Sequence, residues 1–126
     1  MADLAATSLT TDERALVERF AELLRARLGR SLHAVWLFGS RARGEPASHE
    51  DSDVDLLVLV DDDSWDETTA VYGVLREAAR ELDLESIAPW FVVHIHTPEW
   101  LEGRREIKSF FIAEVDRDKL VIEGSG

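Results

Sequence analysis

The sequence contains no cysteine, which excludes disulfide-stapled scaffolds, thiolate metal sites and cysteine nucleophiles. Basic residues are scarce: 14 lysines and arginines face 26 acidic residues, and the formal net charge is −12. Such a surface repels nucleic-acid phosphates, so we expect no direct, broad binding of DNA or RNA. The charge does not exclude a nucleotide that arrives with its own divalent cation.

Long apolar runs are also absent. Uninterrupted apolar segments such as residues 56–60 are far too short to span a bilayer, and residues 1–30 carry charges throughout. We therefore expect a cytoplasmic protein with no membrane segment and no export signal. The length of 126 residues and the hydrophobic content of 45% fit a single domain over 1–126. We expect its ends, 1–9 and 124–126, to be loose.

Helix signals are strong at three places along the chain. Thr10 and Glu13 form a predicted capping box at the start of the first helix. Apolar residues follow at helical spacing, and Gly29 is placed to end this helix. A second helix is predicted to open at Ser64. A third is predicted to start after Thr97 and to run through residue 115.

Strand signals lie between these helices. Apolar, β-rich segments predict strands at 32–38, 53–60, 87–96 and 120–122. Pro89 fits either an edge strand or the start of a strand, so the third strand lies at a sheet edge or begins near Pro89. The alternation of helices and strands predicts an α/β fold, a small mixed β-sheet with flanking helices.

One polar stretch stands out between the first two predicted strands. It reads Gly-Ser-Arg-Ala-Arg-Gly from Gly39 and then Asp-Ser-Asp-Val-Asp-Leu-Leu-Val from Asp51. Asp53 and Asp55 are two residues apart at the start of a strand, so both carboxylates point to one face. Residues 44–63 hold eight acidic residues and no lysine or arginine. Because unpaired carboxylates repel, the pair is a candidate site for Mg²⁺ or Mn²⁺.

Gly39 and Ser40 directly follow the first strand. Glycine permits close backbone approach, and successive amide groups can cradle a phosphate. If the first two strands are antiparallel neighbours, this cradle lies beside Asp53 and Asp55, as phosphoryl or nucleotidyl transfer requires. Arg41 and Arg43 are candidates for contacting the triphosphate. The alternative is that both arginines only solvate the surface, and that the stretch is a polar turn.

The motifs Gly-Ser-x-Ala-Arg-Gly and Ser-Asp-x-Asp-Leu-Leu-Val resemble those of the nucleotidyltransferase superfamily named after DNA polymerase beta. The small size is similar to its minimal nucleotidyltransferases (MNT), which often partner HEPN-domain proteins. The resemblance implies that Gly39 and Ser40 bind nucleotide phosphate and that Asp53 and Asp55 hold divalent metals. It also implies ATP as donor, a toxin–antitoxin setting, and transfer of AMP to an acceptor hydroxyl, such as one on a protein.

The sequence departs from this pattern at the third carboxylate, which the family places on a later strand. Residues 90–96 contain no acid. His94 and His96 share one face of this strand, either as half-buried residues satisfied by the backbone or near the site. His94 is the best-placed substitute for the missing ligand.

Two hypotheses therefore stand. The intact Gly-Ser and Asp-x-Asp elements favour a Mg²⁺-dependent nucleotidyltransferase. The missing acid favours a weak or silent antitoxin-like subunit that binds a HEPN protein.

Overall fold

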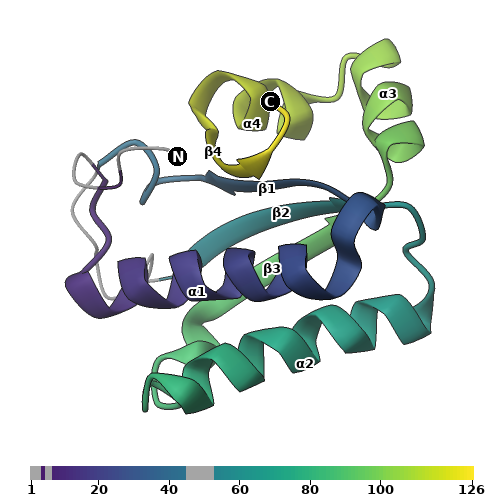
Figure 1. The fold of residues 1–126 in the computed structure, drawn as a ribbon. Coiled ribbons are helices and arrows are strands. Elements are labelled where there is room, and N and C mark those ends of the chain that lie inside the picture. The colour runs from purple at the N-terminus through teal and green to yellow at the C-terminus, as the bar shows by residue number, and fades with distance from the viewer. Residues whose placement is uncertain (1–3, 5–6, 45–52) are drawn as a thin grey trace.

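A computed structural model describes residues 4, 7–44 and 53–126. These residues form a mixed four-stranded sheet with helices on both faces, which confirms the predicted α/β class (Figure 1). The main elements are α1 Thr11–Leu28, β1 Leu32–Phe38, β2 Val54–Val60, α2 Trp65–Glu81, β3 Phe91–His96, α3 Pro98–Glu106, α4 Phe110–Asp118 and β4 Leu120–Gly124. Short 3-10 helices, Gly29–Ser31 and Ala88–Trp90, precede β1 and β3. No helix in the described part of the chain is both long and apolar enough to cross a membrane.

The helices begin where the capping residues predict. The Thr10 hydroxyl accepts a hydrogen bond from the Glu13 amide (3.1 Å), and the Glu13 carboxylate accepts one from the Thr10 amide (2.8 Å). Ser64 and Thr97 cap α2 and α3 in the same way, each accepting from a backbone amide three residues on. These short-range bonds satisfy amides that have no partner within the helix.

The strands lie in the order β3-β2-β1-β4. β1 is antiparallel to both β2 and β4, whereas β3 is parallel to β2. The two central strands are buried on both faces, as their apolar runs predict. β3 is an edge strand, and Pro89 lies in the 3-10 turn before it, where its missing N–H costs no ladder bond.

Two apolar clusters cover the two faces of the sheet. α1 and α2 pack on one face, against residues such as Leu37, Leu56 and Val93. α3 and α4 pack on the other face, against residues such as Trp36, Phe38 and Leu57 (Figure 1). The strand residues of the second cluster alternate with those of the first, so each strand contributes to both layers.

The prediction of a single helix from Pro98 through Val115 is wrong, because two helices cover this range. The helix is interrupted at Lys108, which has a φ of +53°. Ser109 then caps α4, because its hydroxyl accepts a hydrogen bond from the Ile112 amide. The apolar spacing continues across the break, because α3 and α4 both face the sheet, and periodicity alone therefore does not reveal it.

Parts of both ends that are predicted to be loose make contacts with the rest of the fold. Leu4 and Leu9 are buried, and the Ser8 amide donates to the Arg41 carbonyl (3.1 Å). At the other end, the Trp36 indole donates to the Ser125 carbonyl (2.7 Å). Residues 1–3 and 5–6 lie outside the described part of the chain.

Candidate active site

The acid pair lies at the N-terminal end of β2. Asp55 is directly opposite Phe38 of β1, so its side chain lies on the face covered by α3 and α4. Asp55 is half-buried, and Asp53 is exposed just before the strand. Asp51 and Ser52, which open the motif, lie outside the described residues.

Electrostatics set Asp55 apart from a surface carboxylate. Burial raises its pKa, the charge of Asp53 raises it further, and His94 acts in the opposite direction. Among the residues that the structure describes, neither Asp53 nor Asp55 has an ion pair or a hydrogen bond through its side chain. A half-buried carboxylate beside a second carboxylate is a candidate ligand for a cation.

Gly39 brings the turn after β1 against this carboxylate. Its φ is +80°, and a Cβ built there would lie 2.8 Å from Asp55 Oδ2. Any side chain at this position would therefore meet the carboxylate of Asp55. The amides of Ala42 and Arg43 both donate to the Gly39 carbonyl, which closes the turn that contains Ser40. The prediction that the end of the first strand meets the start of the second is confirmed.

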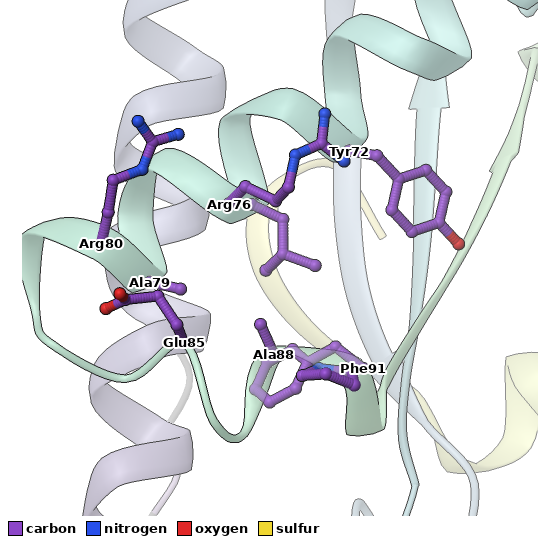
Figure 2. A pocket seen from close by; sticks show the side chains of 9 residues that line it. Tyr72, Arg76, Ala79, Arg80, Glu85, Ala88 and Phe91 are labelled. Atoms are coloured by element: carbon purple, nitrogen blue, oxygen red, sulfur yellow. The ribbon is translucent and has the colours of Figure 1, made fainter.

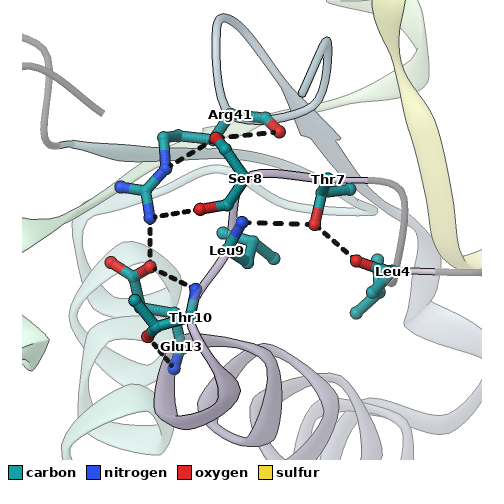
Figure 3. Close-up of polar contacts among 7 residues, drawn as sticks. All are labelled: Leu4, Thr7, Ser8, Leu9, Thr10, Glu13 and Arg41. Atoms are coloured by element: carbon teal, nitrogen blue, oxygen red, sulfur yellow. Dashed lines mark hydrogen bonds and ion pairs between the residues drawn. The ribbon is translucent and has the colours of Figure 1, made fainter. Parts of the chain in front are cut away.

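Arg41 directs its guanidinium toward the start of α1. Its side chain is only 3% exposed and forms an ion pair with Glu13 in the first turn of α1 (Figure 3). It also donates to the Ser8 hydroxyl and the Ser8 carbonyl, both at 3.1 Å. Arg41 thus connects the turn to the N-terminus of α1, and its contact with phosphate stays a prediction. In the segment before α1, the Leu9 amide donates to the Thr7 hydroxyl (3.3 Å; Figure 3).

Arg43 points to the other side of the turn. Its guanidinium lies 3.0 Å from the carboxylate of Asp118 at the end of α4. Together with Gly39 and Phe111 it lines a cavity of about 210 Å³. Arg43 thus stays a candidate for contacting phosphate.

β3 supplies the third side of the site. Val92 is directly opposite Asp55 in the parallel register, and His94 lies opposite Leu57, one pair further along the same face. The His94 ring packs against Phe38 and Phe111, with ring centres 5.4 and 5.8 Å away. The position nearest the acid pair is therefore held by valine. Within the described ranges, no group of three or more acidic or histidine side chains is arranged to hold a metal ion.

α4 adds residues that the sequence did not predict for the site. Phe111 packs edge-on against Phe38 at 5.7 Å, and Glu114 and Asp118 line the same cavity. Arg117 and Arg43 hold the pKa of Asp118 at about 2 through hydrogen bonds and charge. In the sequence Phe111 belongs to an apolar helical stripe typical of a core, and no local pattern links it to Gly39.

A second hollow, of about 480 Å³, lies between α2 and the turn before β3 (Figure 2). Its walls include Leu75, Ala79 and Phe91, with Arg76 and Arg80 on the helix above. Phe91 and Leu75 belong to the cluster on the α1–α2 face of the sheet, whereas Asp55 faces α3 and α4. This hollow is therefore not part of the acid-pair site.

Comparisons with known proteins agree with this geometry. The family model described as "Polymerase beta, Nucleotidyltransferase" matches residues 21–91, a span that contains the Gly39 turn and both acids. A crystal structure described as a toxin-antitoxin with AMP-PNP is similar in fold, with a TM-score of 0.50 and 20% identity, covering 86% of this chain and 73% of that chain. No curated protein matches the sequence. Because the family model spans more than half of the chain, the protein belongs to the polymerase beta nucleotidyltransferase family.

Proposed function

We propose that the protein is a Mg²⁺-dependent nucleotidyltransferase that moves AMP from ATP to an acceptor hydroxyl. The observation that carries this proposal is the contact between the Gly39 turn and Asp55, where an added Cβ would lie 2.8 Å from a carboxylate oxygen. A backbone cradle and an acid pair thereby meet inside the region that the family model matches. Phosphoryl chemistry needs this combination, because it depends on positioning and charge neutralisation.

The donor set fits a hard divalent cation. Asp53 and Asp55 would hold it, and triphosphate oxygens and water would fill the other positions, as is usual for Mg²⁺. When bound, the cation supplies charge neutralisation at the phosphates. The raised pKa of Asp55 supports this assignment, since burial and Asp53 both disfavour an uncompensated carboxylate there.

The remaining steps fall to the residues of the chain itself. The backbone of Gly39 and Ser40 binds phosphate oxygens, and Arg43 orients the triphosphate by a charged hydrogen bond. The acceptor oxygen forms a bond to the α-phosphorus, and the bond from that phosphorus to the pyrophosphate oxygen breaks. We assign the acceptor's proton to an imidazole nitrogen of His94, whose ring lies near enough to influence the pKa of Asp55.

A partner protein is a further part of the proposal. The similar crystal structure is described as a toxin-antitoxin, and a HEPN-domain protein is the partner that the sequence resemblance suggests. Such a partner would carry the acceptor hydroxyl. If Val92 leaves the ligand set too weak for turnover, the protein would instead bind that partner without modifying it.

The test is transfer of label from ATP labelled at the α-phosphate, with Mg²⁺, to a co-purified partner. We expect labelled partner with the wild type and none with Asp53→Asn/Asp55→Asn. Glu102→Gln/Glu106→Gln, which removes the same charge from exposed positions on α3, should keep full transfer. Complex formation with no label under any condition would contradict the enzyme and leave the binding subunit.

A further inference from the structure

The cavity beside the Gly39 turn has the features of a nucleoside site. It measures about 210 Å³ and lies between the turn after β1 and helix α4. One part of its lining is aromatic and apolar and the other part is charged, from the residues Phe38, Phe111, Gly39, Arg43, Glu114 and Asp118. Ligand sites commonly combine an apolar wall with a few polar groups that fix orientation.

The cavity is continuous with the place assigned to the phosphates. Gly39 lines it and also lies against the Asp55 carboxylate. A triphosphate held by the Gly39–Ser40 backbone therefore has this hollow directly beside it. Arg43 lines the same cavity, and its guanidinium lies 3.0 Å from the carboxylate of Asp118, which lines it too.

The aromatic part of the lining leaves one ring partly open. Phe38 is 7% exposed, whereas Phe111 is 38% exposed. Phe111 meets Phe38 edge-on, with an angle of 85° between the ring planes, and is tilted by 46° against His94. An exposed phenylalanine supported by two rings is a platform on which a planar base stacks and removes apolar surface from water.

The charged part of the lining indicates which bases fit. Glu114 and Asp118 present carboxylates, which only accept hydrogen bonds when ionised. Asp118 stays ionised at neutral pH, because its pKa is about 2. A base with an exocyclic amino group, such as adenine, donates to these oxygens, whereas uracil has no such amino group.

We propose that the nucleoside of the donor occupies this cavity, with its base against Phe111 and its exocyclic amino group toward Glu114 and Asp118. The inference rests on the proposed function, since the phosphates must be held at Gly39 and the acid pair. It adds residues on α4 that bind the nucleoside and select the base.

The experiment compares the binding of Mg²⁺–ATP, Mg²⁺–UTP and Mg²⁺–tripolyphosphate by titration calorimetry. Phe111→Ala should weaken ATP binding about ten-fold or more, because a base loses its stacking partner. It should leave tripolyphosphate affinity unchanged, since that probe has no base. Phe110→Ala is the matched control: the same residue type on the same helix, 78% exposed and outside the cavity lining. It should change neither affinity.

A second variant separates stacking from folding. Phe111→Leu keeps an apolar side chain against Phe38 but removes the ring, so it should show the ATP defect with an unchanged melting temperature. For base selection, wild type should bind ATP more tightly than UTP, and Glu114→Gln should narrow that difference.

The outcomes distinguish this inference from the proposed function. If the wild type binds ATP and tripolyphosphate, and Phe111→Ala and Phe111→Leu both bind ATP with wild-type affinity, the nucleoside site alone is overturned. Failure of the wild type to bind tripolyphosphate or ATP would overturn the proposed function as well. Equal affinity for UTP and ATP would overturn the role of the carboxylates.

Discussion

Replacing Gly39 by alanine places a methyl group against the carboxylate of Asp55. The new methyl group would lie 2.8 Å from Asp55 Oδ2, at a backbone φ of +80°. Two separate costs follow. The left-handed backbone disfavours any side chain by about 1–2 kcal/mol, and the Asp55 carboxylate must move away from the position it occupies beside the turn.

A double-mutant cycle separates the two costs. Asp55→Ala removes the carboxylate and hence the steric contact, but it leaves the backbone strain at Gly39. The double variant should therefore be more stable than the sum of the single effects predicts, by about 0.5 kcal/mol or more. For a chain of this size, each kcal/mol corresponds to roughly 4 °C in melting temperature.

Urea and thermal unfolding provide the assay, with Mg²⁺–ATP titration as the functional readout. Gly39→Ala should lose more than ten-fold in nucleotide affinity at a temperature where it is fully folded. Gly103→Ala is the control, because that glycine is in α3 and nothing lies within 4 Å of its added Cβ. It should be neutral or stabilising by up to about 1 kcal/mol. Two results together would refute the close approach between Gly39 and Asp55: unfolding free energies that are strictly additive in the cycle, and an ATP affinity of Gly39→Ala equal to that of the wild type.

Three further predictions follow from buried or register-defined contacts. Arg41→Ala should destabilise the fold by about 3–5 kcal/mol in urea, because it leaves the buried carboxylate of the α1 capping box unpaired; a loss below 1 kcal/mol would contradict the structural role. Val92→Asp should increase the initial rate of Mg²⁺-dependent transfer more than His94→Asp does, since position 92 is directly opposite Asp55. Equal rates in the wild type and both variants would exclude β3 as the third side of the site. The pKa of Asp116 is lowered chiefly by its hydrogen bond from Arg105. The ionised Asp116 therefore stabilises the fold fully above the ordinary aspartate pKa of about 3.9, and this stabilisation is lost as pH falls through the lowered pKa. Asp116→Asn should consequently reduce the loss of unfolding free energy at acidic pH, as measured by urea unfolding.

Local signals account for what the sequence predicted well. Hydroxyl caps such as Thr10 act over three residues, so both partners appear in one short window. The two-residue repeat of strand side chains predicts that Asp53 and Asp55 lie close together, and the charge of Asp53 does act on Asp55. The approach of Gly39 to Asp55 followed from one topological assumption, that the first two strands pair as antiparallel neighbours, and the register confirms that pairing.

Long-range packing accounts for what the sequence did not predict. Arg41 and Arg43 are two residues apart and chemically identical, yet one is buried against Glu13 and the other pairs with Asp118. Both partners are distant in sequence, so nothing local separates a structural arginine from a candidate ligand. Phe111 likewise reaches the site only because α4 packs over β1.

The most direct test of the account is equilibrium binding of ATP with and without Mg²⁺, to the wild type and to Asp53→Asn/Asp55→Asn. The account predicts that the wild type binds ATP with Mg²⁺ and loses most of that affinity when the cation is chelated. It predicts that the double variant binds weakly in both conditions, while its melting temperature without cation is unchanged or higher, because the repulsion at Asp55 is gone. Equal Mg²⁺-dependent affinity in the two proteins would contradict the assignment of this acid pair as the metal and nucleotide site.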